Sequence, residues 1–215
     1  MKLGIFDSGI GGEAIAISLR ATFPKATIVS INDREHLPYG DKTRQQIIEL
    51  TDKAIQPLLQ ATCDIIVIAC NSATANAIEE LRNRYPNQSF IGIEPMVKAA
   101  ATITKTNKIA VCATPATLTS ARYHSLVETY APNMIVIEPD CSNWAYMIEN
   151  NKINHQQIER TVDSICNQGA DVIVLGCTHY HWIKEFITVC ANGRARVLEP
   201  SEAIGRRVLS LLKED

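Results

Sequence analysis

The feature of this sequence that most constrains its fold is an internal repeat of short apolar segments. Four segments of the first half reappear in the same order in the second half, at offsets of 105 to 107 residues. The matched pairs are KLGIF with KIAVC, TIVSI with MIVIE, DIIVIAC with DVIVLGC, and GIEP with VLEP. One match between apolar segments would mean little, but four in order indicate two similar halves of four strands each.

The segments rich in valine and isoleucine are predicted to be β-strands, and the longer amphipathic stretches between most of them to be helices. The predicted strands lie at residues 2–6, 27–31, 64–69, 90–93, 108–112, 134–138, 171–176 and 195–198. This alternation favours parallel sheets covered by helices on both faces. We predict an α/β fold of two similar, pseudo-twofold related lobes, each a mainly parallel four-stranded sheet flanked by helices. The first lobe is expected at residues 1–96 plus 200–215, and the second at 97–199.

The composition of the chain indicates which classes of binding partner and which cellular location to expect. The formal net charge is −2, and lysine and arginine are scattered, so no nucleic-acid partner is expected. Hydrophobic residues make up 46% of the chain and charged residues 20%, which is typical of a folded soluble protein. No apolar run approaches membrane-spanning length, and the start lacks a signal-peptide pattern. We therefore expect a cytoplasmic protein without a membrane segment.

The seven cysteines form no CxxC pair, which argues against a disulfide framework or a zinc ribbon. They are expected to be free thiols, and most free cysteines are small buried apolar residues. We give that interpretation to Cys63, Cys112, Cys166 and Cys190. Cys70 and Cys177 differ because each ends one of two matching strands and is followed by short polar residues.

The carboxyl ends of the strands in two facing lobes would form a ligand-binding cleft, which Cys70 and Cys177 would enter from opposite sides. A helix that starts after a thiol favours the thiolate relative to the ordinary pKa of ~8.5. Two opposed thiols suit racemisation or epimerisation, because one removes a proton and the other delivers one to the opposite face. A one-cysteine nucleophilic hydrolase would leave the other thiol unexplained. A zinc site at Cys177 and His179 does not match known ligand spacings, so we expect no metal.

Other polar residues follow the remaining strands. Asp7 lies in the glycine-rich segment FDSGIGG after the first strand, and Thr114 and Thr117 follow the matching strand of the second half. Tyr39 and Gly40 belong to the segment HLPYG, which follows the second strand. Helix capping is an alternative interpretation for Asp7, and a solvent-facing turn is the alternative for HLPYG.

Taken together, the motifs resemble those of glutamate racemases in the cofactor-independent aspartate/glutamate racemase superfamily. The resemblance rests on GIFDSGIGG at 4–12, PYG at 38–40, ACNSATA at 69–75 and GCTHY at 176–180, and weaker matches extend it over the whole chain. It implies a two-lobed α/β enzyme, expected here as a homodimer, that interconverts L- and D-glutamate without pyridoxal phosphate or metal. The D-glutamate of such bacterial enzymes goes into peptidoglycan.

The resemblance also implies roles for individual residues. Cys70 and Cys177 would be the proton-transfer residues, Asp7 and His179 would assist them, and Glu149 would be a further auxiliary acid. By the family pattern Cys70 would serve D-glutamate and Cys177 L-glutamate. With the two threonines after the fifth strand, the expected substrate-binding residues are Asp7, Ser8, Tyr39, Gly40, Asn71, Ser72, Thr114, Thr117, Thr178 and His179.

Several positions depart from the family pattern. Ser72 stands where threonine is usual, and His181 and Ser142 stand where proline is usual. The stretch between Glu149 and Asp171 is shorter than in typical glutamate racemases. These departures leave two alternatives open: a racemase of the same superfamily that acts on aspartate or another acid, and an inactive homologue with a binding or regulatory role.

Overall fold

In a computed structural model, which describes residues 1–214, the chain forms two four-stranded sheets, and every strand pair is parallel. The first sheet contains β1 (Lys2–Asp7), β2 (Thr27–Asn32), β3 (Ile65–Ile68) and β4 (Ser89–Gly92). The second contains β5 (Lys108–Ala113), β6 (Ile135–Ile137), β7 (Val172–Gly176) and β8 (Arg196–Leu198). The predicted α/β fold with two four-stranded parallel lobes is confirmed.

The two sheets share one topology, which is the structural basis of the sequence repeat. Their strand orders are β2-β1-β3-β4 and β6-β5-β7-β8. β1 pairs with β3 as β5 pairs with β7, with Leu3 opposite Ile65 and Ile109 opposite Val172. Every residue of β3 and β7 is buried, because helices cover both faces of each sheet.

Helices connect the strands. The first lobe contains α1 (Gly11–Thr22), η1 (Arg34–His36), η2 (Tyr39–Asp41), α2 (Arg44–Gln60) and α3 (Asn71–Arg84). The second contains α4 (Val97–Ile103), α5 (Pro115–Leu118), α6 (Ala121–Tyr130), α7 (Trp144–Glu149), α8 (His155–Asn167), η3 (Thr178–Ile183) and α9 (Lys184–Ala191), and α10 (Ser201–Glu214) follows β8. Side chains alternate across each sheet, so Ile5 and Phe6 of β1 belong to separate cores on opposite faces. No helix in the described part of the chain is long and apolar enough to span a membrane.

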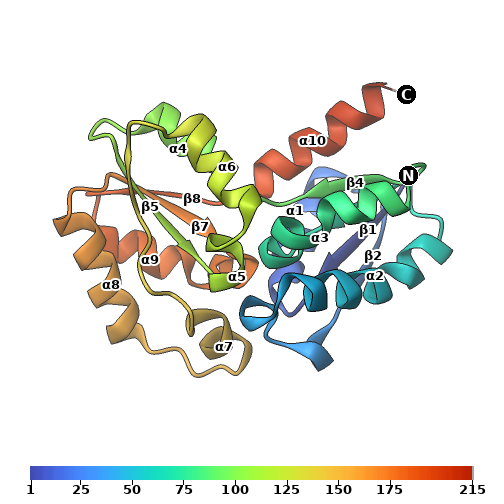
Figure 1. Ribbon diagram of the computed structural model, residues 1–215, viewed down its shortest axis with the longest axis horizontal. Helices are drawn as coiled ribbons and strands as arrows, with labels where there is room; N and C mark the ends of the chain where they lie inside the picture. The colour runs from blue at the N-terminus through green and yellow to red at the C-terminus, as the bar shows by residue number, and fades with distance from the viewer. Residues whose placement is uncertain (215) are drawn as a thin grey trace.

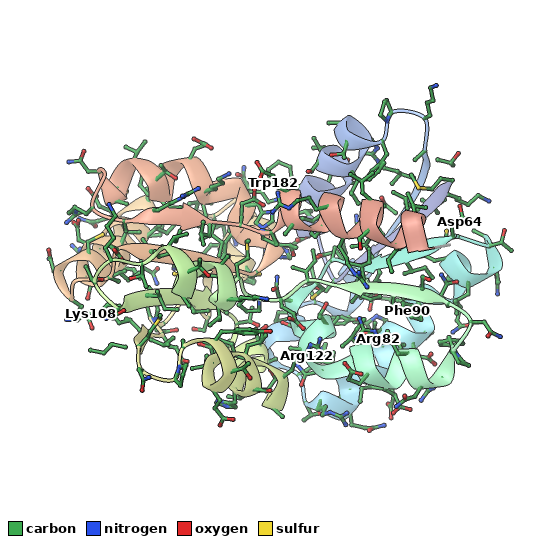
Figure 2. The ribbon with its side chains drawn as sticks, turned by 90° about the horizontal axis from the view of Figure 1, so that it is seen from above. Asp64, Arg82, Phe90, Lys108, Arg122 and Trp182 are labelled. Carbon is green, nitrogen blue, oxygen red and sulfur yellow. The ribbon has the colours of Figure 1, made fainter. Side chains whose placement is uncertain are left out.

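The two lobes lie side by side, with the carboxyl ends of their strands at the junction (Figure 1). Asp64, just before β3, and Lys108, at the start of β5, lie at opposite far ends of the molecule (Figure 2). Both strands therefore run inward from the ends toward the junction. Arg122 and Trp182 lie at this junction in the same view, and each makes a contact between the lobes. The Nη1 of Arg122 is 2.6 Å from Oε1 of Glu79, and the Nε1 of Trp182 donates to the Ile10 carbonyl at 3.3 Å.

The last helix, α10, returns from the second lobe and packs on the first (Figure 1). Its apolar residues Ile204 and Val208 belong to one buried cluster with Leu3 and Ile15. The exact limits proposed for the two lobes stay a prediction.

Candidate active site

A cavity of about 290 Å³ lies at the junction between the lobes, and Cys70 and Cys177 both line it. Cys70 lies two residues after β3 and immediately before α3, and Cys177 lies directly after β7 and immediately before η3. Of the predicted substrate-binding residues, those that line the cavity are Ser8, Tyr39, Gly40, Asn71, Ser72, Thr114, Thr178 and His179. The two lobes therefore bring together residues that are far apart in the chain, as in the hydrogen bond between Asp7 and Thr178, which are 171 positions apart.

Glycines let the lobes approach closely around the cavity. A Cβ atom added at Gly9 would lie 2.6 Å from both Oε2 of Glu149 and Nε2 of His179. At Gly11 an added Cβ would overlap the side chain of Thr178 and lie 2.7 Å from the backbone nitrogen of His179. These glycines have no left-handed backbone angles, so close approach between the lobes is the physical reason for them.

The thiol of Cys70 is buried and protonated at neutral pH. Burial and the nearby charge of Asp7 raise its pKa to about 12, although Ser8 lies in hydrogen-bond contact, 3.3 Å from the sulfur. The expectation that the helix after this thiol would favour the thiolate is thus wrong. Loss of water around the sulfur outweighs the effect of the helix N-terminus.

Cys177 faces a charged pair from its own lobe. Its sulfur lies 3.9 Å from Nδ1 of His179, and Nε2 of the same ring lies 2.8 Å from Oε2 of Glu149. Burial lowers the pKa of His179, but the hydrogen bonds with Cys177 and Glu149 outweigh it and raise the pKa to about 10. Burial raises the pKa of Glu149, and the contacts with His179, the Ile10 amide and Arg34 outweigh it and lower the pKa to about 2. The pair is therefore an imidazolium and a carboxylate at neutral pH, and the imidazolium lies next to the sulfur.

Asp7 is fully buried behind the cavity rather than on its wall. Its carboxylate accepts hydrogen bonds from the Gly9 amide at 2.7 Å and from the hydroxyl of Thr178 at 2.8 Å. Burial raises the pKa of this carboxyl group above its ordinary value. The position lets Asp7 influence Cys70 and hold the two lobes together.

The amide side chain of Asn71 is suited to bind a polar ligand. Both of its polar atoms are buried and have no hydrogen-bond partner among the described residues. Unpaired buried amide groups are costly, so a bound polar group is the natural partner for this one. Beside it, the hydroxyl of Ser72 lies 2.8 Å from that of Thr114, which contacts the hydroxyl of Thr117 at 3.1 Å.

Thr117 lies behind Thr114 and, like Asp7, does not line the cavity. Contact of Thr117 or Asp7 with substrate stays a prediction. The alternative interpretation of HLPYG as a solvent-facing turn is wrong, because Tyr39 is buried, lines the cavity and donates to Asp33 at 2.7 Å.

One wall of the cavity was missed by sequence reasoning. Ser142, Asn143, Ala145 and Tyr146 line it, from the loop before α7 and from α7 itself. The departure from the family pattern at Ser142 was the available signal. Within residues 1–214, no group of three or more His, Cys, Asp and Glu side chains is arranged to hold a metal ion.

The Glu149–His179 pair predicts a pH dependence of stability. Because the pKa of Glu149 is lowered, its carboxylate stabilises the fold at pH values above its ordinary pKa of 4.5, and this contribution is lost as the pH falls toward 2. Because the pKa of His179 is raised, its imidazolium stabilises the fold fully at pH values below its ordinary pKa of 6.5, and this contribution is lost as the pH rises through about 10. Glu149→Gln should therefore lower the free energy of unfolding most between pH 4.5 and 6.5, by on the order of 2 kcal/mol.

Urea unfolding at pH 3, 5.5 and 9 would measure this effect. Glu13→Gln is the control, since Glu13 forms an exposed ion pair with Arg20 on α1 and should change stability by less than about 0.5 kcal/mol. A deficit in Glu149→Gln that is the same at all three pH values would contradict the assigned charge states.

Comparison with known proteins identifies the family of this chain. The family model for Asp/Glu/hydantoin racemase matches residues 14–203. A glutamate racemase of Pseudomonas aeruginosa is 34% identical over 214 residues, which is 98% of this chain and 81% of the relative. The solved glutamate racemase of Aquifex pyrophilus is 34% identical with a TM-score of 0.79, over 100% of this chain and 85% of that one.

A further solved structure, that of glutamate racemase from Francisella tularensis in complex with D-glutamate, is 28% identical with a TM-score of 0.84. It covers 99% of this chain and 81% of that one. The family model and the relatives extend over nearly the whole chain, including both cysteine motifs. The chain therefore belongs to the Asp/Glu/hydantoin racemase family.

Proposed function

We propose that this protein is a glutamate racemase that uses Cys70 and Cys177 as its two proton-transfer residues. The observation that carries the proposal is the pair of thiols that reach one cavity from matching strand ends of two lobes. A single nucleophile would need only one of them, whereas inversion at a carbon needs a base on one face and an acid on the other.

The charges around the two thiols suit Cys177 as the base and Cys70 as the acid, which by the family pattern is the direction that converts the L-enantiomer. The imidazolium of His179 lies beside the sulfur of Cys177, which in its thiolate form takes the proton from the α-carbon. Cys70 is protonated and delivers its proton to the opposite face. The Cα–H bond breaks toward Cys177, and a new Cα–H bond forms from the thiol of Cys70, so one proton is lost and one is gained. The reverse reaction uses the same two groups with their protons exchanged.

Substrate recognition rests on short polar groups suited to a small dicarboxylate. Asn71 and Ser72 begin α3, whose N-terminal amides and dipole favour a carboxylate, and Thr114 and Thr178 add hydroxyls from the second lobe. The structure from Francisella tularensis contains D-glutamate, and the similar proteins named above are glutamate racemases, which supports glutamate over aspartate. The product D-glutamate would serve peptidoglycan synthesis. The homodimer and the cytoplasmic location stay predictions.

Deuterium exchange tests the function. The purified protein is incubated in deuterium oxide with L-glutamate and separately with L-aspartate, and loss of the α-proton is followed by NMR and optical rotation by circular dichroism. We expect exchange and loss of rotation together on glutamate, and neither in the Cys70→Ser, Cys177→Ser double variant. Activity on aspartate alone would correct the substrate, and binding without any exchange would contradict an enzymatic function.

A further inference from the structure

Arg34 makes a contact that neither the resemblance nor the reaction scheme accounts for. It lies in η1, which follows β2 in the first lobe, whereas its partner Glu149 ends α7 in the second. The Nε of Arg34 donates to Oε1 of Glu149 at 2.7 Å. The two residues also line a cavity of about 420 Å³ that shares His179 and Tyr146 with the catalytic cavity. The ion pair thus lies beside the site and joins the two lobes.

Both carboxylate oxygens of Glu149 are engaged. Oε2 receives the Ile10 amide at 3.0 Å and lies 2.8 Å from Nε2 of His179, while Arg34 holds Oε1. The side chain of Glu149 is 9% exposed although that of Arg34 is 60% exposed. The exposed guanidinium of Arg34 therefore restricts the rotation of the buried Glu149 carboxylate. That carboxylate in turn holds the imidazole ring of His179, which faces Cys177.

We propose that Arg34 is a positioning residue, which holds Glu149 in the orientation that aligns His179 on the sulfur of Cys177. Only the expected effect of Arg34 on turnover rests on the proposed racemase function. The physical link is a chain of three contacts, from Arg34 to Glu149, from Glu149 to His179, and from His179 to Cys177. The other titratable groups that act on His179 are Asp7 and His181.

The first test measures turnover in matched variants. Arg34→Ala should lower kcat about fivefold with little change in KM, because it removes alignment of the acid/base pair rather than a substrate contact. Arg34→Lys should recover part of the loss, since the charge remains but the planar geometry of the guanidinium is lost. Arg20→Ala is the control, because Arg20 is also exposed and forms an equally short ion pair with Glu13 at 2.7 Å, away from the cavity.

The second test reports on His179 without needing activity. In protein labelled with ¹⁵N only at histidine, His179 should be an imidazolium at pH 8, because its pKa is raised to about 10. His181 should be neutral, because burial lowers its pKa to about 4, so the two rings are distinguishable. Arg34→Ala should broaden the Nε2 proton signal of His179 and move its titration midpoint downward, and Glu149→Gln should do so more strongly.

The two tests separate the positioning role from the proposed function. If the unmodified protein exchanges no α-proton but His179 responds to Arg34→Ala, the positioning role holds and the racemase proposal fails. If both His179 and kcat in Arg34→Ala match Arg20→Ala, the positioning role is overturned whether or not the protein is a racemase.

Discussion

Cys70→Ser and Cys177→Ser should each lower racemisation at least about 10³-fold, in both directions, because each step needs one thiolate and one thiol. A serine hydroxyl is a far weaker acid than a thiol, so it cannot form the base that removes an α-proton. L- and D-glutamate have equal free energies in water, so kcat/KM must fall equally for both enantiomers. Circular dichroism starting from each pure enantiomer measures both directions.

Exchange without inversion should remain in each single variant. In Cys177→Ser the remaining thiol, Cys70, can remove the α-proton of the enantiomer it faces and return a deuteron to the same face. By the family pattern that enantiomer is D-glutamate, and Cys70→Ser should show the same behaviour with L-glutamate. This mirror-image pattern distinguishes two bases on opposite faces from one base that reaches both.

Cys190→Ser is the control for loss of a thiol. Cys190 lies in α9, is partly buried and does not line the cavity, so turnover should stay unchanged. Near-normal racemisation in either Cys70→Ser or Cys177→Ser would refute the two-thiol mechanism. A covalent adduct with substrate on one cysteine, seen by mass spectrometry, would instead indicate a nucleophilic reaction.

The sequence predicted those features that depend on backbone periodicity. Apolar runs and their repeat identified all eight strands within a few residues, since buried parallel strands are nearly continuous apolar segments. Parallel strands also end at one edge of a sheet, so residues after β1, β3, β5 and β7 were expected at a common cleft. Cys70, Thr114 and Cys177 are among the residues found there.

Features that depend on the direction of side chains and on contact between the lobes could not be predicted from a single sequence. The periodicity of a strand does not show that the side chain of Asp7 lies behind the cavity wall or that Thr117 lies behind Thr114. The pKa of Cys70 depends on how completely the second lobe excludes water from the thiol. Arg34 and Glu149 are 115 positions apart, and no local pattern pairs them.

Gly11→Ala should lower kcat/KM about 100-fold although it adds only one methyl group, because a displacement of about 1 Å at reacting groups costs that much. The new Cβ would overlap the side chain of Thr178 and come within 2.7 Å of the backbone nitrogen of His179. Backbone cannot rotate away as a flexible side chain can, so the two lobes must separate at this point. Separation moves Cys177, on the second lobe, away from Cys70, on the first.

Gly205→Ala is the matched control for this substitution. Gly205 lies in α10, where an added Cβ would meet Thr22 at 3.6 Å, an ordinary contact, and alanine favours a helix by up to about 1 kcal/mol. We expect unchanged turnover and an equal or higher melting temperature for Gly205→Ala. For Gly11→Ala, iodoacetamide should label Cys70 and Cys177 faster than in the parent, because both thiols are almost fully buried while the lobes are closed. Unchanged labelling and turnover in Gly11→Ala would mean that the reaction does not depend on this close approach of the lobes.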